Sequence, residues 1–167
     1  MSDRKTFKVI KMAEVVFSDI DRYDGYLIEI SLPAAFANAI SRSLAESTKN
    51  LKSKLGQNNV YIKLGESQTF DILEDLDLNP LEPELPALLL LDKHPEELKD
   101  TDEVILVKLG ALEKSKEVPL VLDEICQLMN EKDFLSNFSL DQKIRKLKES
   151  FEDYTNVGVS LASVKFG

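Results

Sequence analysis

Hydrophobic residues along this 167-residue chain fall into short apolar runs that alternate with longer segments of helical periodicity. The runs have the length of β-strands, and several of them end at residues that signal turns. In the longer segments, apolar residues recur at intervals of three, four or seven positions, which is typical of amphipathic helices. Strands and helices that alternate in this way predict an α/β fold.

Strands are predicted for residues 7–17, 26–32, 60–64, 88–91, 103–109 and 157–166. The most informative of these is the continuous leucine run at 88–91, which follows Pro86 and precedes a charged turn that contains His94. A run without alternating polar residues suits a strand that is covered on both faces. Proline cannot donate a hydrogen bond to a sheet, so Pro86 is expected at the first position of this strand.

The best helix pattern begins at Pro33, where a missing N–H costs nothing, with Ser31 near the cap. It ends at Gly56, and its apolar stripe comprises Phe36, Ile40, Leu44, Leu51 and Leu55. Further helices are predicted for residues 68–76, 119–130 and 140–154, the last preceded by a Ser139–Gln142 capping box. Residues 79–86 contain three prolines and are expected to form an irregular connection.

Composition and charge narrow the class of protein. Apolar residues make up 43% and charged residues 31% of the chain, which is typical of a globular protein. The net charge is −9, and between Asp71 and Glu103 the acidic residues far outnumber the two lysines. Such a surface disfavours nucleic acid and anionic membranes as partners. Because no signal peptide or membrane span is evident, a cytoplasmic protein is expected.

The residues that carry common chemistry are scarce. With a single cysteine, Cys126, the chain cannot form an internal disulfide or a two-thiol redox centre. With a single histidine, His94, it cannot form a histidine-rich zinc site. Cys126 lies beside the apolar face of a predicted helix and is expected to be a core residue. No catalytic residue, metal site or cofactor is therefore predicted.

The order of elements, with a proline before the leucine strand, resembles the thioredoxin-like superfamily over residues 21–132. This resemblance implies a three-layer fold around a central mixed sheet, with a cis peptide bond before Pro86. Redox members of the superfamily carry Cys-x-x-Cys at the start of the first helix, but residues 35–38 here contain no thiol. Residues 133–167 would add a C-terminal helix and strand to a single domain spanning 1–167. That strand is expected either to extend the sheet or to pair with another chain.

The resulting hypothesis is a non-catalytic, redox-inactive module that binds a protein partner or forms a homo-oligomer. Its binding groove would be built from Pro33, Phe36, Leu85, Pro86 and Ala87. The C-terminal helix and strand are a second candidate for assembly. One alternative is an enzyme of glutathione-transferase or peroxidase type, which needs an activated thiol or hydroxyl near the helix start, where only Ser31 is close. Another is low-affinity calcium binding by the acidic segment.

Overall fold

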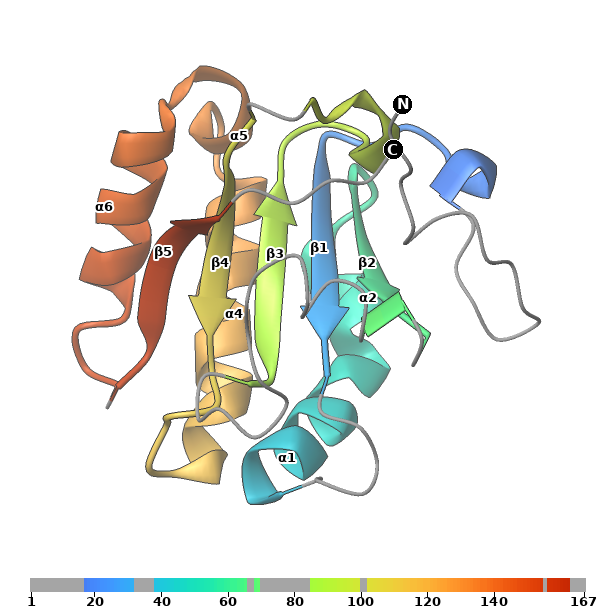
Figure 1. The fold of residues 1–167 in the computed structure, drawn as a ribbon. Helices are drawn as coiled ribbons and strands as arrows, with labels where there is room; N and C mark the ends of the chain where they lie inside the picture. Colours follow the sequence, from blue (N-terminus) through green and yellow to red (C-terminus); the bar gives the residue numbers. More distant parts are fainter. Residues whose placement is uncertain are drawn as a thin grey trace.

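The computed structural model describes residues 17–31, 38–65, 68–69, 85–99, 102–154 and 156–162, apart from the side chain of Lys52. These residues form an α/β fold around a five-stranded mixed sheet with the strand order β2-β1-β3-β4-β5 (Figure 1). The strands are β1 (Gly25–Ile30), β2 (Asn59–Lys63), β3 (Ala87–Leu91), β4 (Val104–Lys108) and β5 (Gly158–Ala162). Only β1 and β2 are parallel; the other neighbours are antiparallel.

The leucine strand lies at the centre of the sheet, as its composition predicts. All five residues of β3 are buried, and the strand pairs with β1 on one side and with β4 on the other. Pro86 immediately precedes the strand and does not occupy its first position, which differs from the prediction. The Leu85–Pro86 peptide bond is cis, as the resemblance implies. The prediction of a strand covered on both faces is therefore confirmed.

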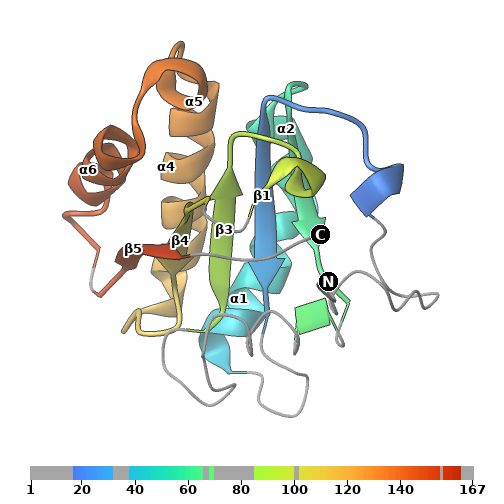
Figure 2. The same ribbon diagram turned by 45° about the horizontal axis from the view of Figure 1, so that its top comes forward.

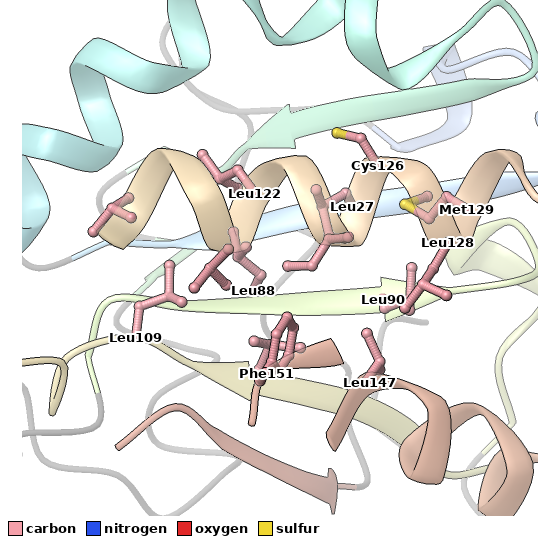
Figure 3. Packing of buried hydrophobic residues seen from close by; sticks show 14 of the residues in the cluster. Leu27, Leu88, Leu90, Leu109, Leu122, Cys126, Leu128, Met129, Leu147 and Phe151 are labelled. Atoms are coloured by element: carbon pink, nitrogen blue, oxygen red, sulfur yellow. The ribbon is translucent and has the colours of Figure 1, made fainter. Parts of the chain in front are cut away.

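The main helices pack on one face of the sheet. They are α1 (Ala39–Ser47), α2 (Leu51–Leu55), α4 (Val118–Asn130), the one-turn α5 (Phe134–Asn137) and α6 (Leu140–Ser150). Their apolar residues form one cluster with alternate residues of the strands, such as Leu27, Leu88 and Leu90. Figure 3 shows this packing, with Leu122 and Cys126 on α4 above the strands and Leu147 on α6 at the side.

A second apolar cluster covers the other face. It contains Tyr26, Ile28, Ile30, Leu89 and Leu106, and its helical member is Phe17, in the 3-10 helix η1 (Phe17–Asp19). The third layer of the expected arrangement is not seen among the described residues. Most of the predicted helix 68–76 and of the predicted strand 7–17 lies outside them.

The first helix differs from its prediction. It begins at Ala39 and not at Pro33, because Asn38 has an extended backbone with φ of −130° and caps it. The Asn38 side chain accepts a hydrogen bond from the Ser41 N–H at 2.9 Å, and the Ser41 hydroxyl accepts one from the Asn38 N–H at 2.7 Å. The single predicted helix is also divided by the 3-10 helix η3 (Thr48–Asn50). Its predicted end at Gly56, with φ of 86°, is confirmed.

The C-terminal elements join the same sheet. β5 pairs with β4 from Val104↔Ala162 to Lys108↔Gly158, so the terminal strand extends the sheet at its edge. α6 begins with the predicted capping box, in which the Ser139 hydroxyl accepts from the Gln142 N–H at 3.2 Å. The helix ends at Ser150, four residues earlier than predicted, where Phe151 leaves the helical conformation and enters the core.

Candidate functional site

The residues predicted to form a groove are only partly described. Pro33 and Phe36 lie outside the described residues, while Leu85, Pro86 and Ala87 are all buried. The carbonyl of Pro86 accepts a hydrogen bond from the Leu109 N–H at 2.9 Å. Because β3 has a neighbour on each side, its backbone from Ala87 onward has no free edge for an added peptide strand.

A buried polar cluster lies beside this position, at the carboxyl end of β1. Glu29 is 3% exposed and points to the same face of the sheet as Leu27. Its two carboxyl oxygens accept hydrogen bonds from the hydroxyls of Tyr61, in β2, and Ser31, just after β1. Alternate residues of a strand share a face, which brings Ser31 next to Glu29. Ser31 also follows Ile30, the partner of Ala87, so the cluster adjoins Pro86.

The protonation of Glu29 is shifted by its surroundings. Burial raises the pKa of the Glu29 carboxyl from its ordinary value of 4.5 to about 7, and the nearby Lys63 opposes this shift. A carboxyl group that titrates near neutral pH can accept a proton from a neighbouring hydroxyl group. The sequence pattern alone does not reveal a general base for the Ser31 hydroxyl group. The missed signal is the two-residue spacing of a glutamate and a serine at the end of a buried strand.

Cys126 has the environment of a core residue, as predicted. It lies on α4 and is 2% exposed. Burial raises the pKa of its thiol to about 11, and the carboxylate of Asp123 adds to the shift. The nucleophilic form of cysteine is the thiolate, so this thiol is poorly suited to attack a disulfide or a peroxide at neutral pH.

His94 serves the local structure. It is buried, its Nδ1 accepts a hydrogen bond from the Glu96 N–H at 3.1 Å, and its Nε2 lies 2.9 Å from the carbonyl oxygen of Ile20. An imidazole that accepts at Nδ1 carries its proton on Nε2, so Nε2 donates to Ile20. The ring also meets Tyr26 edge-on, with centroids 5.5 Å apart. Nδ1 therefore caps the 3-10 helix η4 (Pro95–Glu97), and Nε2 holds this cap against the segment before β1.

The described part of the acidic segment is organised by ion pairs. Asp92 binds the ammonium group of Lys143 at 2.7 Å, and this lysine is 3% exposed although it belongs to α6. Asp102 pairs with Lys93 at 3.3 Å. Within the described residues, no three acidic, histidine or cysteine side chains are placed to hold a metal ion. Much of the segment, at positions 71–84, lies outside them.

Two cavities adjoin Asp92 in the described part of the chain. One, of about 330 Å³, lies between the ends of β3 and β4 and the start of α6, and includes Lys143 in its wall. The other, of about 420 Å³, lies at the amino end of β1. Neither is lined by Pro86 or by Glu29, so neither coincides with the predicted groove or with the hydroxyl–carboxyl cluster.

No helix in the described ranges combines the length and the apolar character needed to cross a bilayer. Comparison with protein-family models, with curated proteins and with solved structures gives no match to this chain.

Proposed function

We propose that this chain is a non-catalytic module of thioredoxin-like architecture that binds another protein or a second copy of itself, without thiol–disulfide exchange. The strand order β2-β1-β3-β4, the parallel β1–β2 pair and the proline before β3 support the architecture. The observation that carries the functional part is the place of the single thiol. Cys126 lies on α4, buried and with a raised pKa, whereas α1 begins at the Asn38 cap.

The absence of disulfide exchange has a direct test. The chain should not accelerate the reduction of insulin disulfides by dithiothreitol, and Cys126→Ser should behave like the unchanged chain, because the buried thiol is protonated at neutral pH. Acceleration that disappears in Cys126→Ser would contradict the proposal.

The outer edge of β5 supports self-assembly. Among the described strands β5 is the last of the sheet, it pairs with β4, and all five of its residues are half-exposed. Its sequence, Gly-Val-Ser-Leu-Ala, contains no charge and no proline, the residues that usually protect an edge strand. An antiparallel pair of two β5 strands centred on Ser160 would bring no like charges together. Such an edge accepts an added strand through its backbone groups.

Sedimentation velocity over a range of concentrations tests this interface. The unchanged chain should form a dimer as its concentration rises, and Ser160→Lys should remain monomeric because two lysines would face each other across the two-fold axis. Ser160→Thr is the matched control and should still dimerise, since threonine favours strands. A chain that is monomeric throughout would exclude self-assembly through β5.

Binding of another protein at the groove has a separate test. If the backbone beside Pro86 contacts the partner, Pro86→Ala should weaken capture of the protein that co-purifies with the native chain. Leu120→Ala provides a control, because Leu120 lies on α4, its side chain is exposed, and it is not one of the predicted groove residues. Equal capture by both variants would exclude the groove.

A hydroxyl-dependent enzyme is the second candidate, and the Ser31–Glu29 hydrogen bond is the observation in its favour. The same hydrogen bond speaks against a glutathione-transferase mechanism. There the serine hydroxyl would donate to a thiolate, but here it donates to a buried carboxyl group that would repel a thiolate when ionised. Calorimetric titration with glutathione should therefore show no saturable binding.

A further inference from the structure

The 420 Å³ cavity at the amino end of β1 is a second candidate site, at the opposite end of that strand from Glu29. In both ribbon views, the amino end of β1 lies at the same end of the sheet as the loop between α4 and α5 (Figure 1, Figure 2). The walls of the cavity come from the turn before β1, the turn before β2 and residues 129–136. We call it the acidic hollow.

Carboxylate groups dominate the walls of the acidic hollow. Asp24, Asp92, Glu131 and Asp133 line it, against a single cation, Lys132. Asp92 is already paired with Lys143 at 2.7 Å, so the other three acidic side chains supply the attraction for a cation. Because the described acids do not converge on one point as metal ligands, an extended cation with several contact points fits the hollow better than a metal ion.

A buried acceptor without a partner lies at the floor of the acidic hollow. Asn59, which is 7% exposed, donates through Nδ2 to the carbonyl of Leu55 at 2.9 Å and to Oδ1 of Asn130 at 3.3 Å. Its own Oδ1 is buried and has no hydrogen-bond partner. Buried polar atoms without partners are rare and call for an explanation.

The direction of this oxygen is set by Gly25. The point where a Cβ of Gly25 would lie is 2.6 Å from Asn59 Oδ1, 2.6 Å from Leu135 Cδ1 and 2.8 Å from Met129 Cε. Asn59, Leu135 and Met129 all line the hollow, so the oxygen lies behind its lining, between Gly25 and the half-buried side chain of Leu135. For a ligand donor to reach this oxygen, the Leu135 side chain would have to change its rotamer.

We propose that the acidic hollow binds an organic cation with N–H donors at both ends, of the diamine, polyamine or guanidinium class. One N–H group of the ligand would donate to Asn59 Oδ1. The other end would pair with the carboxylates of Glu131 and Asp133, which are both exposed. A cation without N–H groups would leave the buried oxygen without a hydrogen-bond donor.

Calorimetric titration of the full chain with putrescine and agmatine at low salt tests the site. The test variant is Glu131→Gln with Asp133→Asn, which keeps the shapes of both side chains. Asparagine also tolerates the φ of 77° at position 133 and can still accept from Asn137. The control variant is Glu149→Gln with Glu152→Gln, two exposed residues in the last turn of α6 and just after it, which give the same change in net charge.

Saturable one-to-one binding is expected for the unchanged chain and for the control variant, with a dissociation constant about three- to tenfold higher for the test variant. Putrescine should also bind at least about fivefold more tightly than its fully N-methylated analogue, which has the same charge and no N–H groups. Absence of saturable binding, equal weakening in both variants, or equal binding of the methylated analogue would each overturn the proposal.

Discussion

The two ends of β1 differ in how their buried charged groups are stabilised, by neutral hydrogen-bond donors at one end and by an ion pair at the other. At the carboxyl end, Glu29 is surrounded by neutral donors, the hydroxyls of Ser31 and Tyr61. At the amino end, the buried ammonium of Lys143 has a full countercharge in Asp92. The carboxyl group without a directly bound cation has its pKa raised to about 7. The stability contributed at the carboxyl end of β1 therefore depends on pH, whereas the stability contributed at the amino end depends on the pairing of opposite charges.

The largest expected effect is the pH dependence caused by Glu29. Its pKa is about 7 in the folded chain and near 4.5 in the unfolded chain, so the folded state binds the proton more tightly. The stabilisation is therefore full below pH 4.5 and is lost as the pH rises through 7. Since one pKa unit corresponds to about 1.4 kcal/mol, the change in unfolding free energy over this window is roughly 3 kcal/mol.

Glu29→Gln should remove this slope, because the amide does not titrate. Urea unfolding at several pH values from 4.5 to 8 measures it as the difference between the two proteins. Glu149→Gln, an exposed glutamate, should leave the slope unchanged. Parallel curves for the unchanged chain and Glu29→Gln would show that the two ends of β1 do not differ in their response to protons.

The next effect concerns the amino end. Asp92→Asn would leave the buried Lys143 without a countercharge and should lower the unfolding free energy by about 2 kcal/mol, less than for a fully buried pair because Asp92 is 39% exposed. Lys143→Met removes the buried charge itself and should cost less than about 1 kcal/mol. Chemical denaturation of both variants makes this comparison. A larger loss for Lys143→Met would mean that packing of the lysine chain matters more than its charge.

A smaller effect is expected from filling the floor of the acidic hollow. Gly25→Ala would place a Cβ 2.6 Å from Asn59 Oδ1 and from Leu135 Cδ1, so we expect a loss of about 1–2 kcal/mol. Gly158→Ala is the matched control in an edge strand, where the three atoms nearest to the added Cβ are side-chain carbons of Lys108, at 3.4–3.7 Å. Thermal unfolding should show a lower midpoint for Gly25→Ala alone. Equal midpoints would mean that the side chains of Asn59, Leu135 and Met129 can move away from the added Cβ at little cost in free energy.

Much of the fold follows from local sequence signals. The central position of β3 could be predicted because a leucine run without polar alternation has to be covered on both faces. The Ser139 cap and the end at Gly56 follow from short-range chemistry in the same way. The start of α1 could not be predicted in this way, because Pro33 and Asn38 are both residues that often begin a helix. The sequence does not reveal that Asn38 has the extended backbone of a cap.

The candidate sites are harder to predict from the sequence, because their residues are far apart along the chain. Glu29 meets Tyr61 32 positions later only through the register of β1 and β2. Asp92 meets Lys143 51 positions later, because α6 returns to the end of β3. A glutamate in a strand and a lysine in a helix are both expected on the surface, so neither residue type signals its own burial.

The smallest effect is expected at His94, near the amino end of β1. Two substitutions there distinguish the contribution of its hydrogen bond to Glu96 from the contribution of its ring packing. His94→Ala and His94→Asn both lose the contact with Tyr26, but asparagine keeps a side-chain acceptor that can receive the Glu96 N–H. His94→Asn should therefore be more stable than His94→Ala by about 1 kcal/mol in urea unfolding. Equal stabilities would mean that the ring matters for its packing and not for its hydrogen bond.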